Sequence, residues 1–416
     1  MPTNHSDVLI IGAGVIGLAC AHYLAMAGRH VRVIDRETVG AGASHGNCGL
    51  VFTSDLPPLC QPGVLRQEFF RLLQRTSPLY IKPELNCGRL RWFLRFAGKC
   101  NPAHLEHAIR SRAQILKYSR MLFLDLMAEH RLSCDWETRG VLLVHSDERT
   151  LARYARINAL LEPYGLEAGF LDSRALVKRE PALRDDLCGG WYHPVDAHLR
   201  PDRLMNAWKR LLCERGVLFQ EHCTLKGLVG SSERIEAART SRGRFTADHY
   251  ILATGAWSPA IASRLKLRLP IEPAKGYSIT MQRPRLCPAI PCYFAERGVV
   301  ATPWRSGYRL GGTLEFSGLN TTVAATRMVQ LESAARLYLR EPLGSPVQEK
   351  WVGIRPMCSD DLPIIDFVPG HRNLLIATGH GMMGVSMATG TGKLAADLLT
   401  GHPTDIDPAP FRLTRF

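Results

Sequence analysis

The chain has 416 residues, 46% of them apolar and 22% charged, and its 52 basic and 38 acidic residues give a formal net charge of +14. This composition is ordinary for a globular protein, and the length allows two domains. The 12 cysteines include no Cys-x-x-Cys pair, so the sequence offers no zinc or iron–sulfur pattern. We expect no metal, and we expect reduced thiols in a reducing compartment.

The excess positive charge is compatible with nucleic acid, an anionic membrane surface or an acidic substrate. No nucleic-acid motif is present, and we expect no nucleic-acid partner. The densest basic group, Lys99 through Arg120, is interleaved with apolar positions at helical spacing. A solvated helix face is the plainer interpretation, and weak attraction to an anionic membrane is the main alternative. We expect a cytoplasmic protein, with peripheral association on the inner face of the cell membrane left open.

The stretch from Val8 to Asp35 has the order of a dinucleotide-binding βαβ unit, with a strand, three spaced glycines, a helix-like run and a second strand. The glycines allow a tight turn, close approach of the backbone to a pyrophosphate, and packing of helix against strand. The helix N-terminus favours phosphate, and the Asp35 carboxylate is placed to accept from ribose hydroxyls. The predicted cofactor contacts here are Gly12, Ala13, Gly14, Val15, Ile16, Gly17, Asp35 and Arg36.

The same stretch could be taken for a signal peptide or a membrane span, because Val8 to Gly28 contain no charged residue. However, Met1 to Asp7 carry no Lys or Arg, which makes a poor n-region, and the glycines fit a phosphate turn better than a lipid-facing helix. We therefore expect a soluble protein that keeps its N-terminus.

A second glycine-rich stretch spans residues 40–49, where four glycines in ten residues exclude a regular helix. It predicts a loop lying against a ligand, with Ser44, Asn47 and Gly49 as cofactor contacts.

Further along the chain, periodicity predicts a long amphipathic helix over 104–130, a strand over 140–145 and a helix near 147–163. Pro201 suits the first turn of a helix that runs to Arg215. Strands are expected over 217–219, near 225–229 and near 233–239, and a buried strand from Tyr250 ends in a small-residue turn. Residues 270–355 are rich in strand patterns, with one helix near 322–340.

The chain ends in a strand over 373–377, a glycine turn, and a helix from Val385 to Thr400 capped by Gly401. This second strand–glycine–helix unit makes the nucleotide domain discontinuous, which suits FAD wrapped at both ends better than NAD. A helix N-terminus aimed at the flavin ring would stabilise the anion formed on reduction. The further predicted cofactor contacts are Thr254, Gly255, Gly379, His380, Gly381, Met382, Met383 and Gly384.

Over nearly the whole chain, these motifs resemble the FAD-dependent D-amino acid oxidase superfamily. Within it, the chain is most similar to the bacterial D-amino acid dehydrogenase small-subunit group, which includes D-hydroxyproline dehydrogenases. The matching stretches are Gly12-x-Gly14-x-x-Gly17, Ser44-x-x-Asn47-x-Gly49, Lys275-Gly-Tyr277-Ser-Ile-Thr280, Gly311-Gly312, Gly353-Ile-Arg355-Pro-Met and Thr378-Gly-His380-Gly-x-x-Gly384.

One departure from the group follows Arg355. Where the group commonly shows Asp-Gly-x-Pro and then Val-Ile-Gly, this chain has Asp360-Asp361-Leu-Pro363-Ile-Ile-Asp366. We expect local adjustment of the loop and no loss of the site.

The resemblance implies FAD, an α/β fold with a discontinuous Rossmann-like FAD-binding domain, and a second, mostly antiparallel β-sheet domain for the substrate. We place the FAD-binding domain at residues 1–55, 196–265 and 360–416, and the substrate-binding domain at 56–195 and 266–359.

Oxidation of an amine at its α-carbon requires a clamped carboxylate, a neutral amine, and a Cα–H directed at flavin N5. Arg355 is our candidate clamp, because a guanidinium binds a carboxylate bidentately and its motif matches the family's carboxylate-binding arginine. Tyr277 is a candidate for lining the site or bonding the carboxylate, and His380 lies in the glycine turn beneath the ring; for both, a structural role is the alternative. Tyr308 and Glu315 are weaker candidates, and the family requires no protein base.

The predicted activity is hydride transfer to flavin from a D-amino acid, with cyclic D-proline or 4-hydroxy-D-proline as options, and electron transfer to a quinone or the respiratory chain. The products would be an imino acid and then a 2-oxo acid and ammonia, whereas a cyclic substrate would stop at a ring imine. The alternatives are an FAD subunit of a heteromeric amine dehydrogenase that needs partner subunits, and an oxygen-using glycine or sarcosine oxidase that forms peroxide.

Overall fold

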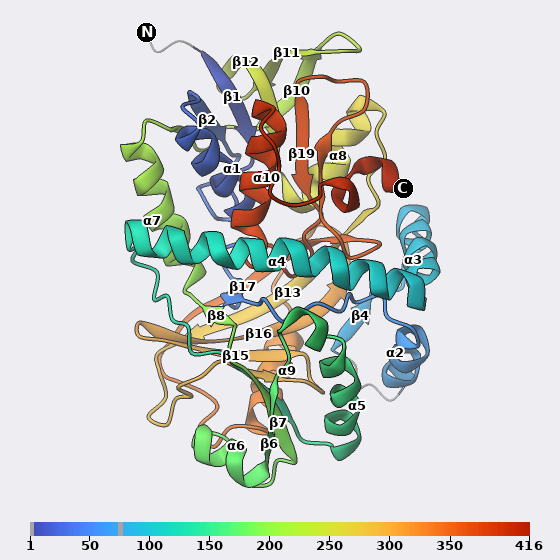
Figure 1. The fold of residues 1–416 in the computed structure, drawn as a ribbon, viewed down its shortest axis with the longest axis vertical. Helices are drawn as coiled ribbons and strands as arrows, with labels where there is room; N and C mark the ends of the chain where they lie inside the picture. The colour runs from blue at the N-terminus through green and yellow to red at the C-terminus, as the bar shows by residue number, and fades with distance from the viewer. Residues whose placement is uncertain (1–3, 74–77) are drawn as a thin grey trace.

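The protein is described by a computed structural model that covers residues 4–73 and 78–416. Two large β-sheets organise it, and Figure 1 shows them one above the other along the long axis of the molecule. A long helix crosses in front of the level at which they meet, and the C-terminus lies beside the upper sheet. We therefore expect the sites predicted from the sequence to lie where these two sheets meet.

The upper sheet has eight strands in the described part of the chain, and its centre is parallel. β12 lies between β1 and β19, and it pairs in parallel with both. β19 is buried along its whole length, and β1 and β12 are apolar and buried in the halves that pair at the centre of the sheet, Val8–Ile11 and Tyr250–Leu252, as expected where helices cover a parallel sheet. The strands are β1 His5–Ile11, β2 Val31–Ile34, β9 Leu218–Gln220, β10 Leu225–Gly230, β11 Ile235–Thr240, β12 Gly243–Leu252, β18 Ile364–Phe367 and β19 Leu374–Thr378.

The lower sheet has nine strands among the described residues, and most of its pairs are antiparallel. β13 runs between β16 and β17, which puts the Lys275–Thr280 and Gly353–Met357 motifs on neighbouring strands. The strands are β4 Leu79–Ile81, β5 Val141–His145, β6 Gly169–Asp172, β7 Gly189–His193, β13 Ile271–Met281, β14 Cys292–Phe294, β15 Val299–Trp304, β16 Gly307–Phe316 and β17 Val347–Cys358. A short pair, β3 Leu50–Val51 and β8 Ala197–His198, lies outside both sheets.

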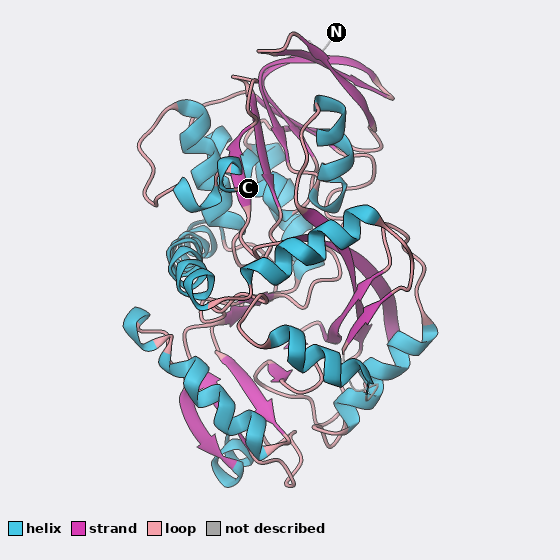
Figure 2. Ribbon diagram, turned by 90° about the vertical axis from the view of Figure 1, so that its right-hand side faces the viewer, coloured by secondary structure: helices cyan, strands magenta, loops and turns pink. Residues whose placement is uncertain are grey.

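Small residues bring three helices together on the upper sheet. A Cβ on Gly392 of α10 would overlap Ala19 of α1, and a Cβ on Gly390 would lie 3.1 Å from the carbonyl oxygen of Ile115 in α4. The helices are α1 Val15–Met26, α2 Val64–Leu73, α3 Cys87–Lys99, α4 Pro102–His130, α5 Glu148–Ala159, α6 Ser173–Arg179, α7 Pro201–Glu214, α8 Ser258–Ala262, α9 Ala325–Arg336 and α10 Ala388–Thr400. Figure 2 shows how helices cover the molecule on the side at the right-hand edge of Figure 1.

The structure confirms the predicted α/β fold with a parallel nucleotide-type sheet and a mostly antiparallel second sheet. α4 begins and ends close to the predicted bounds, because Asn101 caps its N-terminus with a hydrogen bond from the His104 amide and Arg131 ends it in a left-handed conformation. Its buried face belongs to the same core as α1 and α10, although α4 falls within the range 56–195 assigned to the other domain. The sequence analysis did not predict α2 and α3, and the domain bounds stay a prediction.

Candidate active site

A cavity of about 1870 Å³ is lined by residues from both large sheets. This volume exceeds the roughly 300–1,000 Å³ of ordinary small-ligand sites, so the cavity can hold an elongated cofactor together with a substrate. Its wall runs from the glycine turn after β1, past the loop 41–48, to strands β13, β16 and β17 and the turn before α10.

The turn between β1 and α1 is shaped by its three glycines. Gly12 has a left-handed φ of 110°, and a Cβ there would overlap the carbonyl oxygen of Ala253. A Cβ on Gly17 would overlap the Gly12 carbonyl, whereas Gly14 faces the cavity with only Ser44 Oγ nearby. The first turn of α1 therefore packs tightly on β1 and leaves an open cradle in front of its backbone amides.

Asp35 holds this cradle from the end of β2. One carboxylate oxygen accepts from the Ala13 amide at 2.7 Å and the other accepts from the Glu37 amide at 2.9 Å. Burial raises the pKa of Asp35, and these two hydrogen bonds oppose the rise. Asp35 and Arg36 both line the cavity, and the Arg36 guanidinium lies 3.9 Å from the centre of the Trp257 ring. At this end of the cavity, a carboxylate and a stacked cation flank the phosphate-type turn.

The loop 44–49 is fastened to α1 and, through Arg309, to the lower sheet. Ser44 Oγ accepts from the Val15 amide at 3.0 Å, which fixes the loop to the start of α1. Asn47 Oδ1 accepts from the Gly49 amide at 2.7 Å, and Ser44 and Asn47 line the cavity. A Cβ on Gly49 would overlap the carbonyl oxygen of Leu199, so this glycine allows a close approach behind the wall.

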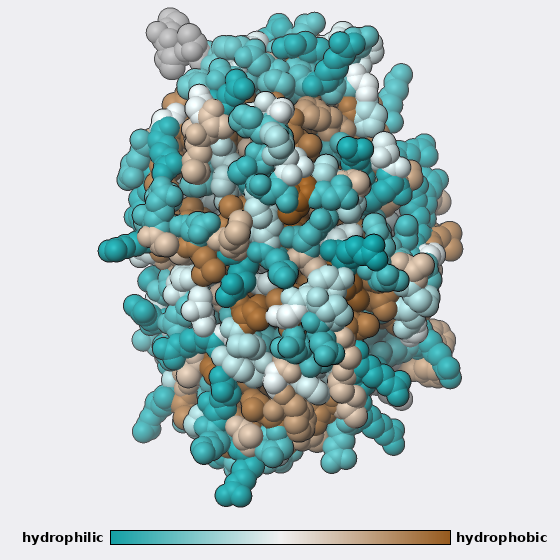
Figure 3. All heavy atoms as spheres, viewed as in Figure 1, coloured by the Kyte–Doolittle hydropathy of each residue, from teal (hydrophilic) through white to brown (hydrophobic). Residues whose placement is uncertain are grey.

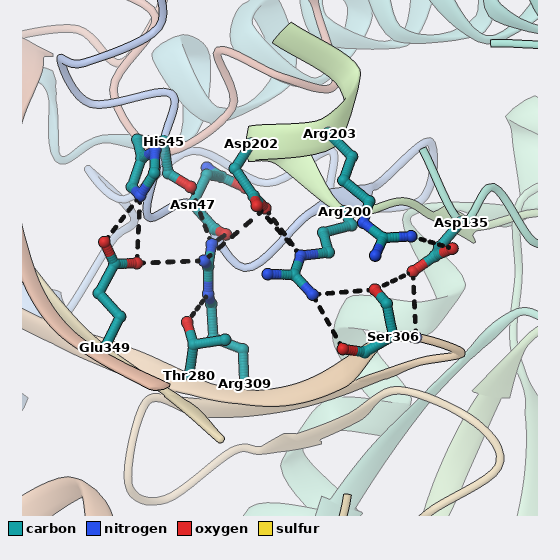
Figure 4. Close-up of polar contacts among 10 residues, drawn as sticks. All are labelled: His45, Asn47, Asp135, Arg200, Asp202, Arg203, Thr280, Ser306, Arg309 and Glu349. Carbon is teal, nitrogen blue, oxygen red and sulfur yellow. Dashed lines mark hydrogen bonds and ion pairs between the residues drawn. The ribbon is translucent and has the colours of Figure 1, made fainter. Parts of the chain in front are cut away.

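Arg309 on β16 fastens the same loop from the lower sheet, as Figure 4 shows. Its Nη1 donates to the carbonyl oxygens of His45 and Asn47 at 2.9 and 2.7 Å, and its Nε donates to Thr280 Oγ1 at 2.9 Å. Glu349 accepts from His45 Nε2 at 2.9 Å and lies 3.8 Å from Arg309. Because the Arg309 side chain is almost completely buried, it fixes the path of the loop firmly.

Arg355 on β17 projects across the neighbouring strand β13 and lines the cavity. A Cβ on Gly276 would overlap its guanidinium, so the clamp position exists only because residue 276 is glycine. Nη1 donates to the Thr313 carbonyl at 2.7 Å. Burial lowers the pKa of Arg355, but an arginine remains charged at neutral pH. Within the described residues no Asp or Glu forms an ion pair with it, so a positive charge is presented to the cavity without a protein counter-ion.

Tyr277 also lines the cavity, but its hydroxyl donates to Glu315 Oε2 at 3.0 Å. Burial and the neighbouring Glu315 carboxylate raise the pKa of Tyr277, so it stays protonated. Burial opposes ionisation of Glu315, yet hydrogen bonds from Ser317 and Tyr277 and the cations Lys275 and Arg327 lower its pKa. The one hydroxyl proton of Tyr277 is thus donated to the charged Glu315 carboxylate within the cavity wall.

The turn before α10 brings the C-terminal glycine motif to the cavity. His380 is buried, and its Nε2 lies 2.9 Å from Thr391 Oγ1 in α10. Burial lowers the pKa of His380 to about 3, so the ring is neutral at working pH. Gly381 donates its amide to the Pro356 carbonyl at 3.0 Å, which ties the turn to β17 beside Arg355.

Most predicted site residues share this one cavity. Its wall includes Gly12, Gly14, Val15, Ile16, Asp35, Arg36, Ser44, Asn47, Thr254, Gly255, Tyr277, Arg355, His380, Gly381, Met382, Met383 and Gly384. Ala13, Gly17, Gly49 and Gly379 shape the backbone behind that wall. The weaker candidate Tyr308 is fully buried in the core of the lower sheet.

Sequence reasoning missed a buried charged group behind the turn. Arg112 of α4 donates to Asp361 Oδ2 at 2.6 Å and to the Asp55 carbonyl at 2.8 Å, and all three residues line the cavity. Asp361 has a left-handed φ of 57°, which suits the glycine that the related group has at this position. The expected loop adjustment therefore takes the form of an ion pair that anchors the loop to α4. The one sequence signal for this ion pair is Asp361, a charged residue at a position where the related group has glycine.

Two further observations limit the kinds of site. In the described residues, no helix is long and apolar enough to cross a membrane. Across the same residues, no group of three or more His, Cys, Asp or Glu side chains is arranged to hold a metal ion.

Known proteins match this chain over nearly its whole length. A family profile described as FAD dependent oxidoreductase, DAO, matches residues 7–398. The protein named D-amino acid dehydrogenase of Allorhizobium ampelinum is 32% identical over 98% of this chain and 98% of its own. The protein of the same name from Granulibacter bethesdensis is 31% identical over 98% and 99% of the two chains.

Solved structures with the same fold include glycine oxidase from Geobacillus kaustophilus, with a TM-score of 0.81 and 24% identity over 100% of both chains. L-proline dehydrogenase from P. horikoshii has a TM-score of 0.76 and 19% identity over 99% of this chain and 98% of its own. These structural likenesses establish the two-layer fold.

Proposed function

The chain belongs to the DAO family of FAD-dependent oxidoreductases, and from that premise we propose that it is a dehydrogenase of D-amino acids. The carboxylate of the substrate would bind Arg355 on the cavity wall. The products would be the imino acid and then, after hydrolysis by water, a 2-oxo acid and ammonia. A cyclic D-imino acid such as D-proline or 4-hydroxy-D-proline would stop at the ring imine.

FAD is the cofactor of this family, and the residues present fit it. The open cradle at Gly14 faces the cavity, where a Cβ would instead narrow the approach to the α1 amides. The Gly14–Ile16 turn would hold the pyrophosphate, Asp35 and Arg36 the adenosine end, and the loop 44–49 with the turn 379–384 the ring end. When bound, FAD supplies the acceptor for the hydride that leaves the substrate's α-carbon.

The observation that carries the proposal is the position of the Arg355 guanidinium on the cavity wall. It is positive, lies on the cavity wall, and has no carboxylate partner in the described chain. A buried charge without a counter-ion is costly, and a substrate carboxylate supplies one through charge-assisted hydrogen bonds. An amino acid binds such a site through the group that all amino acids share, which leaves the amine and Cα–H to be oriented by the rest of the wall.

Tyr277 and His380 act in this proposal through their neighbours. Because the Tyr277 proton goes to Glu315, its oxygen can only accept from a ligand, which suits an amine N–H better than a carboxylate. Because His380 is neutral and bonded to Thr391, it positions the turn 379–384 and takes up no further proton during turnover.

The electron acceptor is the part of the proposal that separates a dehydrogenase from an oxidase. We propose a quinone-type acceptor; the full-length relatives are named dehydrogenases, not oxidases. The test supplies the purified single chain with D-alanine, D-proline and 4-hydroxy-D-proline, and with either a water-soluble artificial acceptor or oxygen alone. Acceptor reduction with little peroxide supports the proposal. Peroxide formation at an equal rate would make the protein an oxidase, and inactivity of the lone chain would make it a subunit of a larger enzyme.

A further inference from the structure

Large apolar side chains are exposed in one region far more densely than elsewhere. Of the 20 such side chains among the described residues, seven lie between residues 65 and 94. They are Leu65, Phe69, Phe70, Tyr80, Leu85, Leu90 and Leu94. Leu85 precedes α3 and is fully exposed. We call this set, with the exposed arginines described next, the α2–α3 surface.

The exposed apolar residues of α3 are not the core-facing side of an ordinary amphipathic helix. The inner side of α3 already packs Trp92, Phe93 and Phe96 in a core cluster, and Leu90 and Leu94 lie on the outer side at exposures of 61% and 66%. A surface helix normally has a polar outer side. Here the outer side alternates leucine with arginine.

Positive charge accompanies these apolar residues. Residues 64–99 contain eight Lys and Arg against two Asp and Glu, but Arg89 is buried against Glu272, and the side chains of Arg71 and Arg75 lie outside the described part of the chain. Arg66, Arg91 and Arg95 are exposed, and no carboxylate of the described chain forms an ion pair with them. The acidic Glu84 pairs with Lys82 at 3.2 Å. The α2–α3 surface is therefore both apolar and basic, with little acidic charge to oppose an anionic partner.

The basic group that the sequence singled out, Lys99 through Arg120, differs in this respect. Arg110 pairs with Glu106 at 2.9 Å, Arg112 is buried against Asp361, and Arg120 donates to the Val195 carbonyl at 2.7 Å. These three arginines therefore already pair or hydrogen-bond with groups of the protein itself. The unpaired positive charge instead lies on the neighbouring α2 and α3.

The α2–α3 surface borders the opening of the cavity. Leu65 and Phe69 are exposed and also line the cavity, and Trp92, Phe93 and Phe96 line it from α3. In Figure 1 the two helices form the right-hand edge of the molecule, and that edge faces the viewer in Figure 2. Figure 3 shows apolar atoms at the same edge.

We propose that the α2–α3 surface docks on an anionic lipid bilayer. The exposed Leu and Phe side chains enter the boundary between headgroups and acyl chains, and Arg66, Arg91 and Arg95 meet lipid phosphates. A bilayer offers an anionic layer and an apolar layer at once, which matches the alternation on α3. Docking in this way gives a lipid-soluble acceptor a path from the bilayer into the cavity; this last step rests on the proposed dehydrogenase activity.

The test measures binding of the holoenzyme to vesicles of phosphatidylglycerol with phosphatidylcholine, and to vesicles of phosphatidylcholine alone. The charge variant is Arg91→Gln with Arg95→Gln, and the apolar variant is Leu90→Ser with Leu94→Ser. The matched control, Met121→Ser with Val329→Ser, changes side chains on α4 and α9 that are similarly exposed. None of these six residues lines the cavity.

We expect the charge variant to bind anionic vesicles about 30-fold more weakly and the apolar variant at least roughly 10-fold more weakly, with the control within about twofold of the parent. Turnover with a water-soluble acceptor should be equal in all variants, and turnover with quinone in anionic vesicles should fall in both surface variants. Equal binding to both vesicle types, equal binding by all variants, or no binding would overturn the docking proposal, the last pointing to a protein partner. Because vesicle binding needs no substrate, failure of the dehydrogenase activity leaves this result readable.

Discussion

The backbone position of Gly276 permits a direct test of the carboxylate clamp. A methyl group at this position would overlap the Arg355 guanidinium, which is the far end of a flexible side chain. Gly276→Ala should therefore displace the clamp without disturbing the fold. Its φ is not left-handed, so alanine adds no backbone strain. A hydrogen bond to a charged group contributes about 1.5–3 kcal/mol, so kcat/KM for D-amino acids should fall roughly 10- to 150-fold.

The assay is steady-state turnover with an artificial acceptor, together with the flavin spectrum and the melting temperature of the holoenzyme. The control is Gly169→Ala on β6, where a Cβ meets nothing within 4 Å; it should leave all three unchanged. Unchanged kcat/KM in Gly276→Ala, or a loss of activity that only follows loss of flavin and a lower melting temperature, would refute the role given to Arg355.

Three further predictions follow from buried charges around the cavity. Arg309→Met removes the donors that hold the loop 44–49 and should raise the dissociation constant for FAD at least about tenfold, measured by flavin fluorescence; retention equal to the parent would contradict this. Asp361→Asn keeps a residue type that tolerates the left-handed φ of 57°, leaves the buried Arg112 short of its closest carboxylate, and should cost about 3 kcal/mol of unfolding free energy in urea; Arg112→Met with Asp361→Asn should recover more than half of this cost. Burial raises the pKa of the Asp196 carboxyl to about 6, so the folded state holds its proton more tightly than the unfolded chain. Stability should consequently fall by about 3 kcal/mol as pH rises from about 3 to 7, and Asp196→Asn should lack this fall; an unaltered pH profile would rule out Asp196 as its source.

Local patterns predicted the parts of the fold whose signals are local. The βαβ unit from Val8 to Asp35 is visible because its strands are continuous apolar runs and its glycines are spaced for one turn. α4 and α10 were predicted from helical periodicity over many residues, and α4 spans Pro102–His130 as expected to within two residues. α2 and α3 were not predicted, and α3 has apolar residues on both its inner and outer sides.

The candidate site likewise has parts that leave a local sequence signal and parts that do not. Its glycine turns and Arg355 carry sequence motifs, whereas the support of the loop 44–49 by Arg309 joins residues about 260 apart and has no local pattern. The pair of Arg112 and Asp361, 249 residues apart, likewise leaves no local pattern in the sequence. For Asp35, the predicted ribose contact stays a prediction, and the structure adds that both its oxygens already accept backbone amides.

The most direct test of the proposed activity is reduction of the bound flavin by substrate without oxygen. The holoenzyme is mixed anaerobically with D- and L-enantiomers of a panel of amino acids that includes both hydroxyproline epimers, and flavin absorbance is followed through a single turnover. We predict bleaching by D-amino or cyclic D-imino acids, and much slower bleaching in Gly276→Ala. Bleaching by L-enantiomers alone, or by no amino acid, would contradict the proposal.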